Sequence, residues 1–457
     1  MLYDYFDVYP RILPVGQCKR VTIKPRYEQR SFAVMQKDGR IWVEYAGDNG
    51  TMFDGRATKW GEFEPLPVQA YDEATDCWTM DVTLPHEGEY TLRLVIEPAD
   101  GRPKREIFHF AMYALEEDLF GLRPFRGDMH CHTSYSECGN RDENPRYVAA
   151  YACYAGLDYL AITDHMQRDP SVLAQKYLEP FELDFQIFNG EEIHLLPKPV
   201  DTLVCRNRFE PAIHLVNFGG KQSVAKYMND HFDEFNAQLN ANAEKLDPKQ
   251  PQKTRWLMAG ADWVFDKIHE YGGVAIFAHP FWHAVMRENL PQPVREYIMK
   301  ERKFDAIELI GLSANMQSRE DNMVNVNWWM QENMKSGKMI PVVGNTDSHG
   351  ARGSLNRRAT IVFAKDKSFE SIAEGICSGH SVAGSFYDGE GPVLYGDYRL
   401  VDFAYYLCRE FYPEHDEESK LLGSVLMDNL RGGCDDATVK AVGKNRLTKL
   451  FKKYWAK

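Results

Sequence analysis

The pattern of hydrophobic residues changes near residue 115, and this change predicts two different folds within one chain. Before that point apolar and polar residues alternate with a period of two, as in Trp78–Leu84 and Tyr90–Ile96. This period sends successive side chains to opposite faces, which is typical of half-buried antiparallel strands. About seven short runs of this kind in roughly 110 residues predict an immunoglobulin-like antiparallel β-sandwich over residues 1–115, without its disulfide.

Beyond residue 122, short apolar segments alternate with helical ones, which indicates βα units in a largely parallel sheet or barrel. The expected strands are Phe125–His130, Tyr159–Thr163, Phe185–Asn189, Val274–Ala278, Ala306–Ile310, Met339–Gly344 and Thr360–Phe363. About seven such units would close a (β/α)7 barrel over residues 122–385. A polar stretch over 221–256 predicts a helical surface insertion, and 386–457 predicts a helical C-terminal extension packed on the barrel.

The charge and cysteine content restrict the expected partners and compartment. The net charge is −13 over 457 residues. Duplex nucleic acid and anionic membranes attract basic surfaces, so we expect neither as a partner. A small phosphorylated ligand remains compatible, because a bound metal can reverse the local charge. The nine cysteines form no CxxC pair, and no apolar run reaches transmembrane length. With no signal-peptide pattern at the N-terminus, we expect a cytoplasmic protein with reduced thiols.

Histidines and carboxylates recur where the expected strands end. His130 and His132 close the first strand, and Asp347 and His349 follow a later one; residues at i and i+2 share one face of a strand. Further strand-like segments end at or contain His165, Glu192, His214 and His279. Active sites of βα barrels form at the carboxyl ends of the strands. Histidine mixed with carboxylate suits zinc, manganese or iron, so the pattern predicts a metal site.

Taken in chain order, these motifs resemble the PHP (polymerase and histidinol phosphatase) superfamily over about residues 122–385. The motifs are Asp128-x-His130-x-His132-Thr133, Ser136-Glu137, Thr163-Asp164-His165, Gly190-x-Glu192, His214, Ala278-His279-Pro280 and Asp347-x-His349. The resemblance implies a distorted (β/α)7 barrel that holds two or three divalent metal ions, and most characterised members hydrolyse phosphoesters. A preceding β-sandwich also resembles a branch of PHP-like metallohydrolases, some of which act on other substrates.

The resemblance implies a set of nine metal ligands, which exceeds what one tetrahedral zinc needs and favours a multinuclear site. They are His130, His132, Glu137, His165, Glu192, His214, His279, Asp347 and His349. The family commonly has Ser-Asp-Gly where this chain has Ser136-Glu137-Cys138, so we expect Glu137 to hold a third ion less firmly. Cys131 lies between two expected ligands, and strand alternation should turn its side chain into the core.

The expected chemistry is attack by a metal-activated hydroxide. Glu192 is expected to bridge two ions, because a carboxylate has two oxygens. His214, His194 and His283 are the candidate general acids, each only if it is free of metal, and the sequence does not choose among them. Arginine matches phosphate geometry, so a further set, which follows the last metal pair, is expected to bind the substrate. That set is Arg352, Arg357 and Arg358.

The favoured function is a metal-dependent phosphoesterase that acts on a small phosphorylated molecule. A metal-bound hydroxide attacks carbonyl and phosphoryl centres alike, so a hydrolase of another ester, a carbamate or an amide remains an alternative. A third alternative is an inactive binding or scaffold protein. An amidohydrolase-type barrel is disfavoured, because it typically carries a bridging lysine and no lysine lies at the expected strand ends.

Overall fold

The computed structural model describes residues 5–36, 39–46, 63–98, 105–195, 212–284, 287–311, 316–387 and 389–456. Contacts divide the chain into two compact units. The first, called here the sandwich unit, comprises Met1–Leu122, Tyr406–Tyr412 and Arg446–Lys457. The second, called the α/β unit, comprises Arg123–Tyr405 and Pro413–Asn445. The chain therefore returns from the second unit to the first near its C-terminus.

The sandwich unit contains two sheets that share one core. One sheet has the antiparallel order β1 (Phe6–Tyr9), β3 (Lys19–Pro25), β7 (Cys77–Val82), β6 (Gln69–Asp72). The other has the order β2 (Ile12–Pro14), β9 (Glu106–Leu115), β8 (Gly88–Pro98), β4 (Gly39–Ala46), β5 (Phe63–Pro65), in which the β2–β9 pair is parallel. Val21 and Met80 of the first sheet pack in one cluster with Val43, Leu94 and Met112 of the second. The segments with the period-two pattern thus form strands of two β-sheets, and the immunoglobulin-like topology stays a prediction.

Two C-terminal segments complete the sandwich unit, although the sequence suggested that they pack on the barrel. They are Tyr406–Tyr412, from the end of α11 (Tyr398–Glu410) onwards, and the segment that contains α14 (Arg446–Tyr454). The Arg11 amide donates to the Tyr454 carbonyl at 2.9 Å, and the Arg11 guanidinium lies 2.6 Å from the Glu410 carboxylate. The short helices η1 (Glu28–Arg30) and α1 (Phe32–Met35) connect β3 to β4, and α2 (Glu117–Phe120) follows β9.

The α/β unit contains two mixed sheets. The first has the order β12 (Gln186–Phe188), β11 (Tyr159–Ile162), β10 (Arg123–Cys131), β20 (Arg358–Ala364), β21 (Ser381–Ser385), β22 (Val393–Tyr395). The second has the order β13 (Gly190–Leu195), β14 (Ile213–Phe218), β15 (Val274–Phe277), β18 (Ala306–Ile310), β19 (Val342–Gly344). The strands β12, β11 and β10 are parallel, and so are β15, β18 and β19. The pairs from β10 to β22 and from β13 to β15 are antiparallel.

Two isolated bridges bring the sheets together at their strand ends. His165 after β11 pairs with Glu192 in β13, and Cys131 at the end of β10 pairs with Ser348 after β19. The mixed α/β class agrees with the sequence analysis, but antiparallel pairing replaces part of the expected parallel sheet. The closed (β/α)7 barrel stays a prediction. The two bridges place the ends of four strands next to one another.

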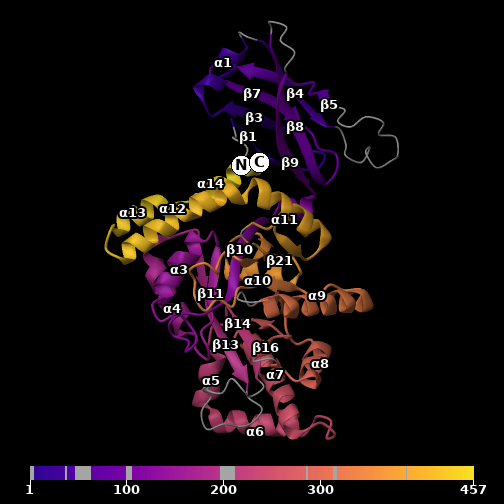
Figure 1. Ribbon diagram of the computed structural model, residues 1–457, viewed down its shortest axis with the longest axis vertical. Coiled ribbons are helices and arrows are strands. Elements are labelled where there is room, and N and C mark those ends of the chain that lie inside the picture. Colours follow the sequence, from indigo (N-terminus) through magenta and orange to yellow (C-terminus); the bar gives the residue numbers. More distant parts are fainter. Residues whose placement is uncertain are drawn as a thin grey trace. The chain divides into compact units, whose positions relative to one another are not determined.

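Helices cover both sheets of the α/β unit, with α3 and α4 on one side of the strands and α8 and α9 on the other in Figure 1. The helices are α3 (Pro145–Tyr154), α4 (Asp169–Leu178), η3 (Glu179–Phe181), α5 (Val224–Asp230), α6 (Phe232–Ala243), α7 (Gln252–Glu270), α8 (Gln292–Glu301), α9 (Met316–Ser336), α10 (Phe369–Cys377), α12 (Tyr412–Leu430) and α13 (Asp436–Gly443), and β16 (His283–Ala284) pairs with β17 (Arg287–Glu288). The polar stretch over 221–256 is helical, as expected.

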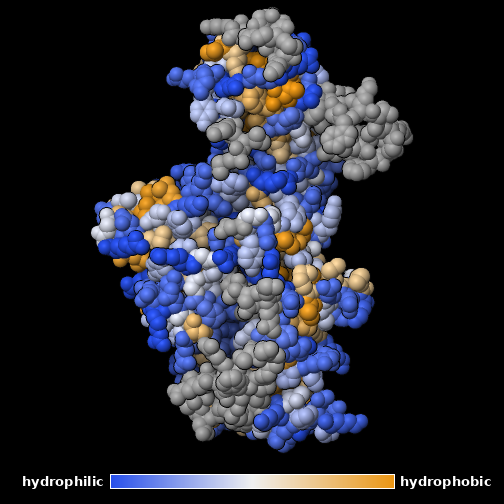
Figure 2. Space-filling view, viewed as in Figure 1, coloured by the Kyte–Doolittle hydropathy of each residue, from blue (hydrophilic) through white to orange (hydrophobic). Residues whose placement is uncertain are grey.

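The surface of α9 is unusually apolar for an exposed helix, and hydrophobic side chains gather there in Figure 2. Met323, Val324, Met330 and Met334 are all exposed. Two other residues of the helix, Val326 and Trp329, are buried in the main core of the α/β unit. In the described part of the chain, no helix has the length and apolar character needed to cross a membrane.

Candidate metal centre

The end of β10 delivers two buried imidazoles to one place. His130 Nε2 lies 3.4 Å from Glu192 Oε1 and 3.4 Å from Asp347 Oδ1, whereas His132 Nε2 lies 2.9 Å from the same Asp347 oxygen. The His132 amide donates to the Ser348 carbonyl at 2.8 Å, which draws this strand end against the residues after β19. The expected convergence of the two i, i+2 pairs is therefore present.

Glu192 lies at the centre of the cluster, with both carboxylate oxygens facing imidazoles. Its Oε1 is 2.8 Å from His214 Nδ1 and 3.5 Å from His279 Nε2. Its Oε2 is 3.1 Å from His165 Nε2 and 3.2 Å from His194 Nε2. Burial raises the pKa of Glu192, but the surrounding imidazoles outweigh burial and hold that pKa well below its usual range. Glu192 is therefore an ionised carboxylate that faces two groups of nitrogen ligands.

A glycine explains how β13 comes close enough to the end of β11 to place Glu192. A Cβ atom on Gly190 would lie 2.6 Å from the Ile162 carbonyl oxygen, closer than a side chain can approach. Glycine removes this clash and permits the His165–Glu192 bridge. Glu191, the adjacent residue, points the other way and accepts hydrogen bonds from Asn217 at 2.9 Å and from the Val224 amide at 2.6 Å. Of the two adjacent glutamates, Glu192, the expected ligand, is therefore the one that faces the histidines.

Two of the cluster residues have left-handed backbone conformations. Asp347 has φ 47° and His279 has φ 23°, in a region that non-glycine residues adopt only at a cost of about 1–3 kcal/mol. Both side chains are turned by this geometry towards the cluster, where His279 Nε2 lies 4.0 Å from Asp347 Oδ2. Strain of this kind persists where the surrounding structure holds it, and it concentrates at functional sites.

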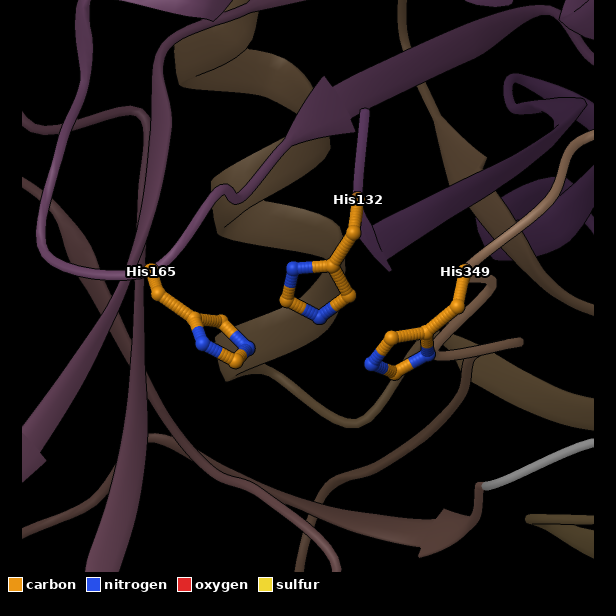
Figure 3. Close-up of side chains that lie close together, drawn as sticks. All are labelled: His132, His165 and His349. Carbon is orange, nitrogen blue, oxygen red and sulfur yellow. The ribbon is translucent and has the colours of Figure 1, made fainter. Parts of the chain in front are cut away.

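Three of the imidazoles near Glu192 form a compact group. Figure 3 shows the His132 ring between those of His165 and His349. One nitrogen from each of these three residues lies within 4.8 Å of the others. The same spacing holds for the three other groups, which are His130–His132–Asp347, His130–Glu192–His279 and His165–Glu192–His194. Eight of the nine expected ligands therefore lie in one cluster, through these groups and the His214–Glu192 contact.

Glu137 is the expected ligand that lies outside these groups. It is exposed, in a turn closed by hydrogen bonds from the Ser136 amide to the Thr133 carbonyl at 3.1 Å and from the Gly139 amide to the Ser136 carbonyl at 3.0 Å. The turn directs Cys138 inward instead, with Sγ 3.7 Å from His165 Nε2. Burial raises the pKa of the Cys138 thiol, but contacts with His165 and His349 outweigh it and lower the pKa to about 7.

Aspartates behind the ligands hold the loops in place. The Asp164 carboxylate accepts hydrogen bonds from the Thr133 amide at 2.8 Å, the Thr133 hydroxyl at 2.6 Å and the Ser136 hydroxyl at 2.6 Å. Asp128 accepts from the His130 amide at 3.0 Å and from the Thr346 hydroxyl at 2.5 Å. Burial raises the pKa of Asp128 to about 7. These two motif residues therefore support the site from behind the ligands, and the Glu192 amide also donates to the Asp164 carbonyl at 3.4 Å.

Two residues of the cluster have roles that sequence reasoning did not assign. Glu308 in β18 lies 2.9 Å from His130 Nδ1. The feature of the sequence that could have identified it is a charged residue inside the apolar run Ala306–Ile310. His194, considered only as a proton donor, has the same i, i+2 spacing from Glu192 that marked the other pairs. Its ring stacks on His214 with centroids 3.9 Å apart. Burial lowers the pKa of His194 to about 3, so the imidazole is neutral, the form that binds metals.

The three arginines and the remaining histidine candidate make their hydrogen bonds to residues outside the ligand groups. Arg352 is exposed and donates to the Tyr147 hydroxyl at 3.1 Å, and Arg357 is partly exposed. Arg358 is buried and donates to the Tyr387 hydroxyl at 2.7 Å and to the Gly311 carbonyl. The predicted phosphate role of these arginines stays a prediction. His283 Nδ1 lies 2.6 Å from Asp321 Oδ1. Cys131 is fully buried in the core, as expected.

The donor set fits divalent metal ions. Several buried polar atoms of the cluster make no hydrogen bond within the described residues: His130 Nε2, both carboxylate oxygens of Glu192 and both ring nitrogens of His194. Buried polar atoms without partners are rare in folded proteins, and bound metal ions would satisfy these atoms. Imidazole nitrogens combined with carboxylates are ligands of zinc, manganese and iron.

Comparisons with known proteins give similar solved structures only. No protein-family model and no curated protein matches the chain. A two-domain protein from Bacteroides vulgatus that contains a predicted PHP-like metal-dependent phosphoesterase is 17% identical, with a TM-score of 0.39, over 63% of this chain and 71% of that chain. Endonuclease Q from Pyrococcus furiosus is 17% identical, with a TM-score of 0.34, over 60% of this chain and 58% of that chain.

A third similar structure corrects the expected partners. It is Endonuclease Q in complex with a 27-mer duplex that carries an abasic lesion at the active site, 16% identical, with a TM-score of 0.33, over 56% of this chain and 57% of that chain. The expectation of a small phosphorylated partner, with duplex nucleic acid disfavoured, was wrong, and the case against nucleic acid had relied on net charge. Binding to a phosphate backbone depends on local surfaces and bound ions, so a net charge of −13 does not exclude it.

Proposed function

We propose that this protein is a metal-dependent phosphoesterase with a multinuclear site in the α/β unit. The observation that carries the proposal is the set of buried, unpartnered atoms on His130, Glu192 and His194 among converging donors. The ligands would be His130, His132, His165, Glu192, His194, His214, His279, Asp347 and His349. Two or three zinc, manganese or iron ions would be held, and when bound they would supply an activated water and neutralise charge on phosphoryl oxygens.

Glu192 is the residue we assign to a bridging position. Its Oε1 faces His130, His214 and His279, whereas its Oε2 faces His132, His165 and His194. Two sets of imidazoles on the two oxygens of one carboxylate support two neighbouring cation subsites. Asp347 Oδ1 lies near both His130 and His132, one histidine from each set.

His283 is the histidine we assign to protonation of the leaving group. The other two candidates, His194 and His214, both contact Glu192 and belong to the ligand cluster. His283 is partly exposed, and its Nδ1 lies 2.6 Å from Asp321 Oδ1, a contact that fixes the ring orientation. His283→Gln should lower kcat by about 10²–10⁴-fold for substrates with poor leaving groups and leave metal content unchanged. An equal loss for an activated nitrophenyl leaving group would contradict this role.

The test combines metal content with hydrolysis. Plasma mass spectrometry should find two or three divalent ions per chain, and hydrolysis should disappear on chelation and return on reloading. Substrates are p-nitrophenyl phosphate, bis(p-nitrophenyl) phosphate, p-nitrophenyl acetate and duplex DNA with an abasic site, the last because of the Endonuclease Q similarity. Turnover of any phosphoester, but not of the acetate, supports the proposal. Turnover of the acetate alone would assign a carboxylester hydrolase instead.

Two variants connect the activity to the cluster. His132→Ala and Asp347→Ala should each lose most bound metal and activity while circular dichroism stays unchanged. The matched control is His231→Ala, because His231 is an exposed histidine whose Nδ1 lies 3.7 Å from the Glu234 carboxylate. Retention of the full metal complement in both site variants would refute the site assignment.

A further inference from the structure

Cys138 occupies the place in the cluster where the sequence suggested Glu137. Its Sγ lies 3.7 Å from His165 Nε2, and the thiol also interacts with His349. The position depends on Gly139, because a Cβ atom there would lie 1.9 Å from the Thr133 carbonyl oxygen. The tight turn that glycine permits sends the carboxylate of Glu137 to solvent and the sulfur of Cys138 inward.

An independent observation marks the same location as a cation subsite. Glu192 Oε2, buried and without a hydrogen bond, lies 3.1 Å from the same His165 Nε2 that faces the sulfur. On the other side, nitrogens of His132, His165 and His349 lie within 4.8 Å of one another. The sulfur therefore borders a group of three imidazoles that already faces an unpartnered carboxylate oxygen.

We propose that Cys138, and not Glu137, is a ligand of the cation subsite formed with His132, His165 and His349. The thiol loses its proton to water when it binds, so that one S–H bond is replaced by one bond from sulfur to the cation. A thiolate is a soft ligand, and a mixed imidazole–thiolate set favours zinc over manganese. The inference rests on the proposed function and adds the metal preference of one subsite.

Cobalt provides a readout that does not depend on catalysis. The full-length protein, freed of metal and reloaded with Co²⁺, should show a thiolate-to-cobalt charge-transfer band in the near ultraviolet. Cys138→Ser should abolish this band and remove one ion per chain, and Glu137→Ala should retain both. Cys153→Ser is the matched control, because Cys153 is a buried cysteine whose Sγ donates to the Ser419 carbonyl at 3.8 Å. Cys138→Asp should retain the ion without the band and bind Mn²⁺ more tightly than the wild type.

The wild-type protein supplies a second measurement in case the variants fold poorly. A thiol reagent should modify one cysteine fewer in the zinc-loaded protein than in the chelated protein. The inference falls if zinc protects no thiol, if the cobalt band survives Cys138→Ser, or if Glu137→Ala removes an ion. These outcomes leave the proposed function standing as long as metal still binds through the histidines. Absence of any bound metal in the wild type would refute the proposed function itself.

Discussion

His130 Nδ1 lies 2.9 Å from Glu308 Oε2, and both side chains are completely buried. A carboxylate in this pair accepts the hydrogen, so Nδ1 carries the proton and Nε2 presents its lone pair to the cluster. The Asn345 side-chain amide donates to the same Glu308 oxygen at 3.1 Å and holds the carboxylate in place. Carboxylates that orient metal-binding histidines in this way strengthen the metal site without touching the metal.

Glu308→Gln should therefore weaken metal binding by about 10–100-fold, because glutamine can no longer act as a pure acceptor for Nδ1–H. Competition with a chromogenic chelator measures the affinity. Glu374→Gln, which changes an exposed carboxylate of α10, is the control. An unchanged affinity in Glu308→Gln would show that the pair has only a packing role.

Metal loading should also stabilise the α/β unit against heat. The cluster places buried imidazoles around Glu192 and Asp347, and a cation would satisfy atoms that now lack partners. A ligand at 100 times its Kd adds about 2.7 kcal/mol to the stability of the folded state. Calorimetry should thus show a higher Tm with Zn²⁺ than with chelator, and no such rise for Asp347→Ala. A Tm that is independent of metal in the wild type would contradict a native metal site.

The sequence predicted which side chains converge better than it predicted the sheets around them. The pairs at His130–His132 and Asp347–His349 were recognisable because strand periodicity alone puts i and i+2 on one face. The antiparallel direction of β14 was not recognisable from the sequence, since an apolar run does not specify its pairing partner. Cys138 was missed for a similar reason: whether the turn after Ser136 directs position 137 or 138 inward depends on backbone geometry that the residue types do not state.

A buried histidine outside the cluster should make stability depend on pH. His415 Nε2 lies 2.7 Å from Asp158, and its Nδ1 lies 3.1 Å from Asp416, which also pairs with Arg126. Burial lowers the pKa of His415, but the two carboxylates outweigh burial and raise it to about 9. A folded pKa above the unfolded value of about 6.5 stabilises the protein below pH 6.5, and this stabilisation disappears as the pH rises through 9.

Urea unfolding of the chelated protein measures this effect. Between pH 6.5 and 9 the free energy of unfolding of the wild type should fall by at most about 3 kcal/mol more than that of His415→Gln. Chelation keeps the pH dependence of metal binding out of the comparison, and His231→Gln, at an exposed site, should behave like the wild type. Parallel pH profiles for the wild type and His415→Gln would mean that His415 is neutral in the folded protein.

His194 gives the sharpest test of whether the cluster is built for metal. Both of its ring nitrogens are buried without a hydrogen bond, and its ring stacks on His214 at an angle of 12°. Phenylalanine would keep the stacked ring and remove the two nitrogens. A buried polar atom without a partner costs about 1–3 kcal/mol, so His194→Phe should stabilise the metal-free protein.

In the presence of Zn²⁺ the same variant lacks a ligand and should gain less stability from metal than the wild type gains. The two Tm values should therefore reverse their order between chelator and zinc, with His194→Phe higher in chelator and the wild type higher in zinc. If His194→Phe is the less stable protein under both conditions, the ring serves packing and hydrogen bonding, and the ligand role of His194 is refuted.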